Sequence, residues 1–362
     1  MKIKFKQIKS DILLFDETNK DIVINTILHG FNYSILETRH KVAVINYHIC
    51  FQLLAKLPRV FRKKKTINKL RELKKIYFLA VIDYIAPKII ITYMDNVPYF
   101  HEICRERQDI VGIAIQNGAR THYNFDEKCQ FEHINRYYLP YYFVHGDHVE
   151  EVYKRYNHQS KEIFIVGSLK LDYFLNSPRK VKHKKYQLSL ISTWTNGNYV
   201  VGNYPWSAEN QYRSLLLVKD MIVKSGLSCV VALKTNQDNE INFYKSIFQD
   251  MADYKIDVED RFSSYNICCN SEVILSTYST LGFELFSLGK NVVFFNLSSD
   301  ERYTHSDLNT INDLDSKSLL NLIYQMMKEP IEYKYNSVSE NQCIQSKKPS
   351  YEKIREFIKE RL

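Results

Sequence analysis

Short apolar runs rich in β-branched residues alternate along the chain with longer stretches in which apolar residues recur at helical spacing. In the first half, the short runs predict strands in residues 11–16, 32–37, 88–96, 109–118, 141–147 and 162–168. The longer stretches predict helices in residues 21–30, 66–86, 98–107 and 148–156. Regular alternation of this kind predicts a parallel sheet that is covered by helices.

The pattern lapses in residues 176–185, N-S-P-R-K-V-K-H-K-K, and then begins again. The second half predicts strands in residues 186–194, 228–235, 271–277 and 291–296, and helices in residues 209–225, 239–252, 280–288, 316–328 and 350–361. We interpret the lapse as a linker between two similar α/β halves. The predicted division is an N-terminal domain in residues 1–178, a C-terminal domain in residues 186–330 and a helical tail in residues 331–362.

The composition favours a large folded core and a reducing compartment. The 362-residue chain is 45% hydrophobic and 25% charged, which argues against wholesale disorder. Its seven cysteines are scattered and never spaced C-x-x-C, so we expect free thiols and no zinc site. The N-terminus lacks a long apolar segment, and no apolar run approaches the ~20 residues that a spanning helix needs. We therefore expect a soluble, cytoplasmic protein.

Positive charge is concentrated in one segment of the chain, whose formal net charge is +9. The segment Lys56–Lys75 contains ten basic residues and one acidic residue. Such a run is either an ordinary solvated helix face or a surface that attracts phospholipid headgroups or a nucleic acid. Aromatic residues are not interleaved with the charges as base stacking requires. We therefore favour peripheral contact with the inner face of the cytoplasmic membrane and expect no nucleic acid.

Several predicted strands end in hydrogen-bonding side chains. Ligands of open parallel sheets collect at the carboxyl ends of the strands, so this coincidence predicts a ligand site. Each polar end alone is also typical of an ordinary turn. The polar ends are Asp95–Asn96, Gln116–Gly118, His145–Asp147 and Gly167–Ser168 in the first half, and Ser192–Thr193, Lys234–Thr235 and Ser276–Thr277 in the second.

One of these strands stops abruptly in I-Q-N-G-A-R-T-H-Y. Gly118 permits a turn that other residues resist and allows close approach to the backbone. Arg120 can bind a carboxylate or phosphate through two parallel hydrogen bonds, and His122 can exchange protons near neutral pH. The segment favours a ligand site, and the alternative is a structural Asn-Gly turn with Arg120 in a salt bridge.

A second polar segment, S-T-Y-S-T-L-G-F-E, joins the strand in residues 271–277 to the next helix. A helix N-terminus that carries hydroxyl groups can bind phosphate, which makes Ser279 and Thr280 candidates. Glu284 follows Thr280 by about one helical turn on the same face and can accept hydrogen bonds from a ribose. The alternative is that Ser279 or Thr280 only caps the helix.

Three segments resemble glycosyltransferases of the GT-B type. S-T-Y-S-T-L-G-F-E-L-F-S-L-G-K-N-V-V-F-F is similar to the donor-nucleotide segment of bacterial surface carbohydrate (polysaccharide) biosynthesis proteins, capsule Kdo transferases and CDP-glycerol transferases. I-Q-N-G-A-R resembles a signature of the first group, and I-F-I-V-G-S-L-K-L-D resembles the G-S-x-x-x-D stretch before their interdomain crossover. With the strand in residues 88–96, the resemblance covers roughly residues 88–295.

The resemblance implies an α/β fold of two Rossmann-like domains that face each other across a cleft, with the donor nucleotide mainly on the C-terminal domain. It implies that Ser279 and Thr280 hold the donor phosphate, that Glu284 meets the ribose and that Tyr265 borders the base. Lys234 stands where relatives place a basic residue, although they often have Lys-Pro or His-Pro and this chain has Lys-Thr-Asn. The predicted nucleotide-binding residues are Gln116, Asn117, Gly118, Ser168, Lys234, Thr235, Tyr265, Ser279, Thr280 and Glu284.

Glycosyl transfer needs a carboxylate or imidazole near the anomeric centre, as acceptor base or as nucleophile. Asp95, at a strand end in the predicted acceptor domain, is the first candidate, and His122 and His145 come next. Each can instead be a structural cap. Arg120 can neutralise a donor phosphate or a sugar carboxylate. Because no D-x-D motif of metal-dependent transferases lies at a convincing strand end, we expect no metal.

Together these features predict a glycosyltransferase that moves a sugar from a nucleotide-activated donor to a bacterial surface glycan, such as lipopolysaccharide or capsule, or to its lipid-linked precursor. A CMP-linked acidic sugar such as Kdo or a nonulosonic acid is the favoured donor, a UDP- or GDP-sugar stays open, and no other cofactor is expected. The alternatives are a CDP-polyol phosphotransferase and a non-catalytic nucleotide- or glycan-binding member of the fold. A nucleic-acid-binding protein would rest on Lys56–Lys75 alone.

Overall fold

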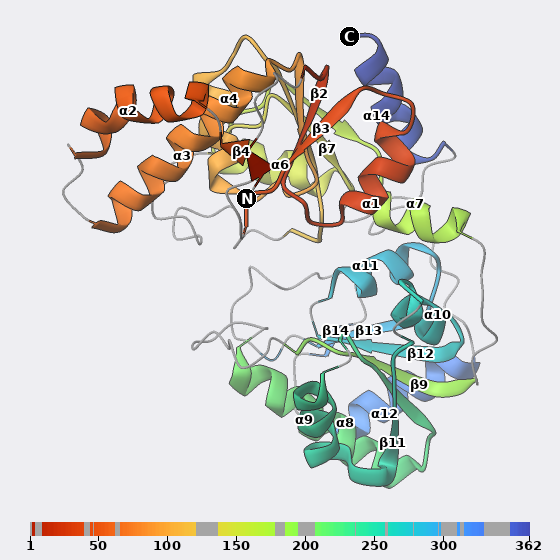
Figure 1. The fold of residues 1–362 in the computed structure, drawn as a ribbon. Coiled ribbons are helices and arrows are strands. Elements are labelled where there is room, and N and C mark those ends of the chain that lie inside the picture. The colour runs from red at the N-terminus through yellow and green to blue at the C-terminus, as the bar shows by residue number, and fades with distance from the viewer. Residues whose placement is uncertain are drawn as a thin grey trace.

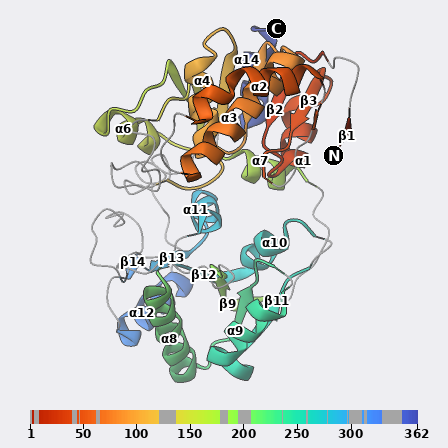
Figure 2. The same ribbon diagram turned by 60° about the vertical axis from the view of Figure 1, so that its left-hand side comes forward.

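The computed structural model contains two α/β lobes, each built on a six-stranded parallel sheet (Figure 1). Strands β1 (Lys2–Ile3) and β4 (Val44–Ile45) form a separate short parallel pair. Figures 1 and 2 show the first lobe above the second. The structure describes residues 2–3, 9–39, 44–45, 47–61, 66–120, 137–177, 185–194, 207–235, 237–257, 260–277, 279–295, 297, 310–311, 315–328 and 348–362.

The sheet of the first lobe has the strand order β3-β2-β5-β6-β7-β8. All residues of β2 and β5 are buried, because helices cover both faces of the sheet and leave no face for polar side chains. The strands are β2 (Ile12–Phe15), β3 (Tyr33–Leu36), β5 (Ile89–Thr92), β6 (Val111–Ile115), β7 (Tyr141–Val144) and β8 (Glu162–Ile165).

Among the described residues, seven helical segments from the first half of the chain and one from residues 350–359 surround this sheet. The last of them, α14 (Ser350–Lys359), buries Ile354, Phe357 and Ile358 in the same apolar cluster as Ile12. The first lobe is therefore completed by residues from the far end of the chain. The other segments are α1 (Lys20–Val23), a π-helix (Ile24–Leu28), α2 (Tyr47–Phe61), α3 (Thr66–Ile85), α4 (Pro98–Glu106), α6 (His148–Arg155) and α7 (Leu169–Asn176).

The second lobe has the strand order β11-β10-β9-β12-β13-β14, so the chain moves outward from β9 in one direction and then outward from β12 in the other. Its strands are β9 (Tyr186–Ile191), β10 (Cys229–Ala232), β11 (Ala252–Lys255), β12 (Ser271–Ser276), β13 (Val292–Phe295) and β14 (Thr310–Ile311). Its helices are α8 (Ala208–Ser225), α9 (Asp238–Phe248), a 3₁₀ turn (Gln249–Met251), α10 (Ser263–Cys269), α11 (Thr280–Ser287) and α12 (Ser316–Lys328).

The predicted fold class, two parallel sheets covered by helices, is confirmed. Every strand and helix predicted from the sequence is present, with ends shifted by a few residues. The patterns missed α2, α7, α10, β11 and the two-residue strands β1, β4 and β14, and the predicted helix in residues 21–30 is largely a π-helix. The predicted linker begins at the end of α7, its residues 178–184 lie outside the described part, and the domain boundaries stay a prediction. Among the described helices, none combines the length and apolar character needed to cross a membrane.

Candidate functional site

A pocket of about 450 Å³ opens at the carboxyl edge of the second sheet. It lies where the strand order reverses between β9 and β12. Ser192 and Thr193 follow β9 and Thr277 follows β12, and the hydroxyl of Thr277 donates to that of Thr193 at 3.3 Å. Helices leave the two strands on opposite faces of the sheet at such a reversal, and the crevice between them is where open α/β sheets bind ligands.

The walls of this pocket carry positive charge and hydroxyl groups. Its cations are Lys170, Lys234 and Arg261, and the described part of the lining contains no carboxylate. This combination favours an anion with several oxygen atoms. The hydroxyl-bearing lining residues are Ser192, Thr193, Ser264, Tyr265, Thr277, Ser279 and Thr280, and Ile191, Gln211, Ala232 and Leu281 complete the lining.

Helix α11 presents its N-terminus to the pocket through Ser279, Thr280 and Leu281. Ser279 caps the helix, since its Oγ accepts a hydrogen bond from the N–H of Leu281 at 3.3 Å. The helix can lie close to β12 because Gly282 has no side chain, and a Cβ there would be 2.5 Å from Ser276 Oγ. The partial positive charge of the helix end adds to the three cations. Ser279 is thus both a cap and a lining residue.

Lys234 reaches the pocket from a turn that a buried carboxylate holds in place. Glu240 accepts hydrogen bonds from the N–H of Lys234 at 2.8 Å and from the N–H of Thr235 at 2.7 Å. The hydroxyls of Thr235 and Ser192 donate to the same carboxylate. The two N–H groups and the Thr235 hydroxyl are therefore engaged by Glu240, and the turn presents the ammonium group of Lys234 to a ligand in the pocket. Sequence reasoning missed Glu240, which stands in the first turn of α9 shortly after the predicted Lys234–Thr235 end.

Glu284, predicted to meet a ribose, joins the two lobes. Its carboxylate accepts hydrogen bonds from Ser168 Oγ in the first lobe, at 2.5 Å, and from the hydroxyl of Tyr265 in the second. It is 1% exposed, and this burial raises its pKa, while the nearby Lys170 opposes the rise. The ammonium of Lys170 in turn lies 5.2 Å from the centre of the Tyr265 ring. Glu284 therefore fixes Tyr265, which lines the pocket, and does not line it itself.

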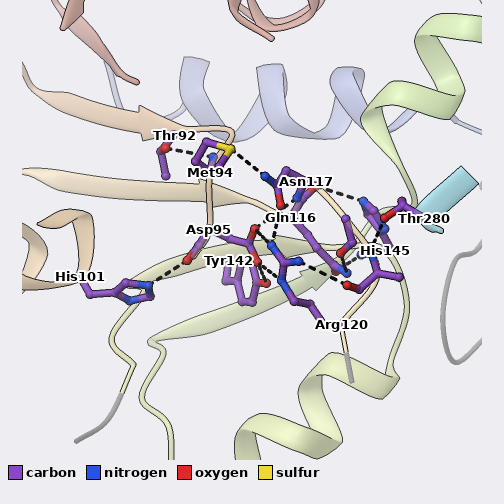
Figure 3. Close-up of polar contacts among 12 residues, drawn as sticks. Thr92, Met94, Asp95, His101, Gln116, Asn117, Arg120, Tyr142, His145 and Thr280 are labelled. Atoms are coloured by element: carbon purple, nitrogen blue, oxygen red, sulfur yellow. Dashed lines mark hydrogen bonds and ion pairs between the residues drawn. The ribbon is translucent and has the colours of Figure 1, made fainter. Parts of the chain in front are cut away.

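The predicted residues of the first lobe gather around Asp95 (Figure 3). One carboxylate oxygen accepts from Arg120 Nη2 at 2.5 Å and from the N–H of Asn117 at 3.3 Å. The other accepts from Arg120 Nε at 2.9 Å and from the Tyr142 hydroxyl at 2.5 Å. Four donors fill the capacity of a carboxylate, and Asp95 is 3% exposed. We call Asp95, Gln116, Asn117, Gly118 and Arg120 the Asp95–Arg120 cluster.

Two buried histidines contact backbone carbonyl groups of this cluster. His101 Nε2 lies 2.8 Å from the carbonyl oxygen of Asp95, and His145 Nε2 lies 3.0 Å from that of Gln116 (Figure 3). Burial lowers the pKa of each to about 4, so both rings are neutral near pH 7 and can donate to these carbonyl groups. His145, a secondary candidate for catalysis, thus holds the Gln116 backbone in place.

Gly118 meets the second lobe directly. Its φ is not in the left-handed region, so the expected need for an unusual turn is wrong. Close approach is the reason for glycine here, because a Cβ would lie 2.9 Å from Thr280 Oγ1. The N–H of Ala119 donates to the same oxygen at 3.0 Å. The approaching group is a side chain of the other lobe, and this contact links the Asp95–Arg120 cluster to the pocket.

The structure divides the predicted site residues among three places. His122 lies outside the residues that the structure describes. The pocket is lined by Lys234, Tyr265, Ser279 and Thr280. The Asp95–Arg120 cluster reaches it through Thr280, and Ser168 and Glu284 bind each other between the lobes.

Sequence reasoning missed two of the three pocket cations. Lys170 stands inside the G-S-L-K-L-D stretch, and Arg261 comes just before S-S-Y. The first lies within a segment that the sequence analysis identified and the second lies four residues before Tyr265, but only the fold brings them to Lys234. Arg261 also reaches the first lobe, where its Nη1 lies 3.5 Å from Asp21. Within the described ranges, no group of three or more His, Cys, Asp and Glu side chains could hold a metal ion.

The chain matches a known protein family over the part that contains the pocket. Residues 113–309, more than half of the chain, match the model of a family described as "putative O-antigen biosynthesis protein". The chain belongs to this family. The matched range includes the whole pocket and every predicted site residue except Asp95. The predicted kinship with surface-carbohydrate biosynthesis proteins is thereby confirmed, while the relation to capsule Kdo transferases stays a prediction.

Solved structures share the fold of this O-antigen family member along nearly its full length. UDP-GlcNAc 2-epimerase from Neisseria meningitidis bound to UDP-GlcNAc has a TM-score of 0.56 at 12% identity, covering 100% of this chain and 99% of its own. The S. aureus MnaA–UDP complex has a TM-score of 0.63 at 12% identity, covering 98% and 96%. The wall teichoic acid polymerase TagF has a TM-score of 0.55 at 12% identity, covering 99% and 90%.

At such low identity these similarities establish the fold alone, and they confirm the two-lobed GT-B arrangement. No curated protein matches the chain. The family and the fold together are consistent with an enzyme of surface-glycan biosynthesis.

Proposed function

We propose that this protein is a glycosyltransferase that moves a sugar from a nucleotide-activated donor to a bacterial surface glycan or its lipid-linked precursor. The observation that carries the proposal is the pocket at the strand reversal of the second sheet. Three cations, seven hydroxyl-bearing residues and a helix N-terminus converge there without a lining carboxylate among the described residues. This is the environment that a donor's phosphate groups require.

A CMP-linked acidic sugar is our favoured donor. It carries a phosphate and a sugar carboxylate, and the pocket offers Lys170, Lys234 and Arg261 to two such anionic groups. Supporting the general class of donor, two fold neighbours are described with UDP-GlcNAc or UDP bound, and TagF is described with CDPG. A UDP-sugar would use the same cations for its second phosphate.

In the proposed reaction, the bond between the anomeric carbon and the donor phosphate breaks as the acceptor hydroxyl attacks. Lys234, Arg261 and the N-terminus of α11 stabilise the negative charge that develops on the departing phosphate. We assign Asp95 a positioning role, since its four lone-pair sites already accept hydrogen bonds from Asn117, Arg120 and Tyr142. His122, two residues beyond Arg120, is our proposed base for the acceptor hydroxyl.

The experiment is a thermal-shift screen of the full chain with CMP, CDP, UDP, GDP and ADP. We expect one nucleotide to raise Tm, and Lys234→Met and Thr280→Ala to weaken its binding about ten- to a hundredfold each, the value of a charge-assisted hydrogen bond. Lys219→Met removes a charge from α8 in the same lobe and should change nothing. The assigned site would be contradicted if none of the five nucleotides raised Tm, or if the nucleotide that binds raised Tm equally in the wild type and in all variants.

Turnover then separates the reaction classes. The nucleotide that binds is supplied as its activated sugar with a bacterial lipid extract, and free nucleotide, sugar and glycan are quantified. Sugar incorporated into glycan supports the proposal. Incorporation of glycerol phosphate from CDP-glycerol would indicate a polyol phosphotransferase, conversion of UDP-GlcNAc without transfer an epimerase, and binding without any product a non-catalytic member of the fold.

A further inference from the structure

Helix α2 exposes a continuous apolar stripe on the outside of the first lobe. Tyr47, Phe51, Leu54 and Phe61 are 65–77% exposed, and Pro58, between the last two, is also exposed. At 100° per residue these five positions fall within about 80° of the helix circumference. The stripe is therefore a coherent face of the helix and not a scatter of surface side chains.

The opposite face of α2 is anchored. Ile49 and Val60 are buried, and α2 packs along α3, whose later residues enter the core of the lobe. Figures 1 and 2 both show α2 and α3 side by side on the outer side of the lobe. Because the inner face already has its partner, the five-residue stripe is a second apolar face, which the described residues leave exposed. Leu70 and Leu73 add an exposed apolar pair on α3.

The charges near this face indicate what covers it. Helix α2 contains Lys56 and Arg59 and no acidic residue, and the first turn of α3 also has none. The inward basic residues of α3 are neutralised inside the lobe, since Arg71 pairs with Glu102 and Lys75 with Glu106. The segment Lys56–Lys75 holds eight further basic residues and one acidic residue, so it keeps a strong net positive charge. A second copy of this strongly basic surface would be repelled by it, whereas an anionic bilayer would be attracted.

We propose that α2 is an interfacial helix that binds the surface of an anionic bilayer, with its five-residue stripe inserted at the level of the headgroups. The helix has 15 residues and a length of ~22 Å, which suits a helix lying in the plane of the surface. This goes beyond attraction of the basic run, because the apolar stripe supplies binding that salt cannot screen. The proposal is independent of the transfer reaction and is tested without it.

The test is co-sedimentation of the full chain with phosphatidylcholine vesicles and with vesicles that also contain phosphatidylglycerol. We expect binding to the anionic vesicles that high salt weakens and does not abolish. Phe51→Ser with Leu54→Ser should weaken it by about tenfold or more, because two large side chains no longer leave water. The control, Leu216→Ser with Val223→Ser, removes two exposed apolar residues from α8 and should bind like the wild type.

Three results would overturn the proposal. The wild type could fail to bind anionic vesicles, or the α2 double variant could bind them as tightly as the wild type. Alternatively, sedimentation equilibrium could show a dimer of the wild type that the α2 variant abolishes, which would make the stripe a contact between copies. The substituted side chains are exposed, so unfolding midpoints of both double variants should match the wild type and keep these outcomes interpretable.

Discussion

Thr280 contributes one hydroxyl to two interactions, at the point where the lobes touch. Its oxygen accepts the N–H of Ala119 at 3.0 Å, and its side chain lines the pocket. A hydroxyl that accepts in this way still has its own proton to donate to a phosphate. The residue therefore couples the position of the Asp95–Arg120 cluster to the occupancy of the pocket.

Substitution of Gly118 by alanine tests this coupling. The new Cβ would lie 2.9 Å from Thr280 Oγ1, so Gly118→Ala should lower the free energy of unfolding by ~1–3 kcal/mol through overpacking. In a Thr280→Ala background the clashing oxygen is gone, and the same substitution should cost less than half as much. Urea unfolding of the four proteins in a double-mutant cycle measures the difference. Strict additivity would mean that the two residues do not meet.

The ion pair of Asp95 and Arg120 is buried, which makes its loss expensive. Asp95→Asn leaves the guanidinium without its counter-charge, and we expect a loss of ~3–5 kcal/mol in the free energy of unfolding. The control is Asp83→Asn, whose partner Arg107 is about a quarter exposed, with an expected loss below ~1 kcal/mol. Chemical denaturation compares the two. Similar small losses would remove the support for a positioning role and return Asp95 to consideration as the base.

At the scale of elements, helix α11 is fixed on two sides. Gly282 lets it approach β12, and Glu284 connects it to Ser168 of the first lobe and to Tyr265 of α10. The N-terminus that faces the pocket is thus placed by contacts one turn farther along the same helix. A change in the charge of Glu284 acts on the site through this placement.

Glu284 should make stability depend on pH. Burial raises its pKa above the usual 4.5, although Lys170 opposes the rise and Asp172 supports it. Between 4.5 and the raised folded value, the folded state binds more protons than the unfolded chain, so the free energy of unfolding falls as pH rises. Glu284→Gln should remove this fall. The free energy of unfolding of the Glu284→Gln variant, relative to that of the wild type, should increase from about pH 4 and level off above the folded pKa of Glu284. Urea unfolding of both proteins at a series of pH values measures this difference. Parallel curves would contradict a raised pKa.

The elements also show what a sequence can predict. Apolar runs located the strands, because strands buried on both faces must be apolar along their whole length. The helix α2 was not predicted, because its second apolar face departs from the pattern of a helix with one buried side. The edge strand β11, A-D-Y-K, was not predicted, because half of its side chains are exposed and it contains no apolar run. Thr280 and Ser279 were found because a helix N-terminus has its own chemistry wherever it lies.

The pocket cations were harder to predict than the strands. Lys170, Lys234 and Arg261 come from three separate segments, and each looks like an ordinary surface residue in its own stretch. Asp95 was predicted to act on substrate because it ends a strand, yet its partners Arg120 and Tyr142 come from elsewhere in the sheet. Pattern and spacing define the edge of a sheet, whereas the pairing of charges across that edge depends on the fold.

For the whole molecule, the G-S-x-x-x-D segment is the junction. Ser168 binds Glu284 of the second lobe, Lys170 enters the pocket, and Asp172 accepts the N–H of Ser350 at 2.6 Å at the start of α14. Three successive polar positions of one segment thus contact the other lobe, the ligand site and the returning end of the chain. The spacing that made this segment resemble known transferases has a structural reason in this protein.

Helix α14 should matter for the first lobe only. Phe357 packs against Tyr141, Phe143 and Phe164, so Phe357→Ala should cost ~3–5 kcal/mol of stability. Hydrogen exchange should speed up in β2 and β5 and stay unchanged in β9 and β12. Glu352→Ala, on the same helix, serves as the control and should change neither sheet. Equal loss of protection in both sheets would show that the lobes unfold as one unit.

The return of α14 to the first lobe also has a consequence during synthesis. A ribosome that has made β2 to β8 has released nearly the whole first lobe, yet the apolar cluster around Ile12 still lacks Ile354, Phe357 and Ile358. Domains generally fold as they emerge, in order from the N-terminus. In this protein the second lobe can finish folding first, and the first lobe keeps an open apolar face until α14 has been translated. Chaperones that recognise such faces therefore have a window set by the time needed to translate the second lobe.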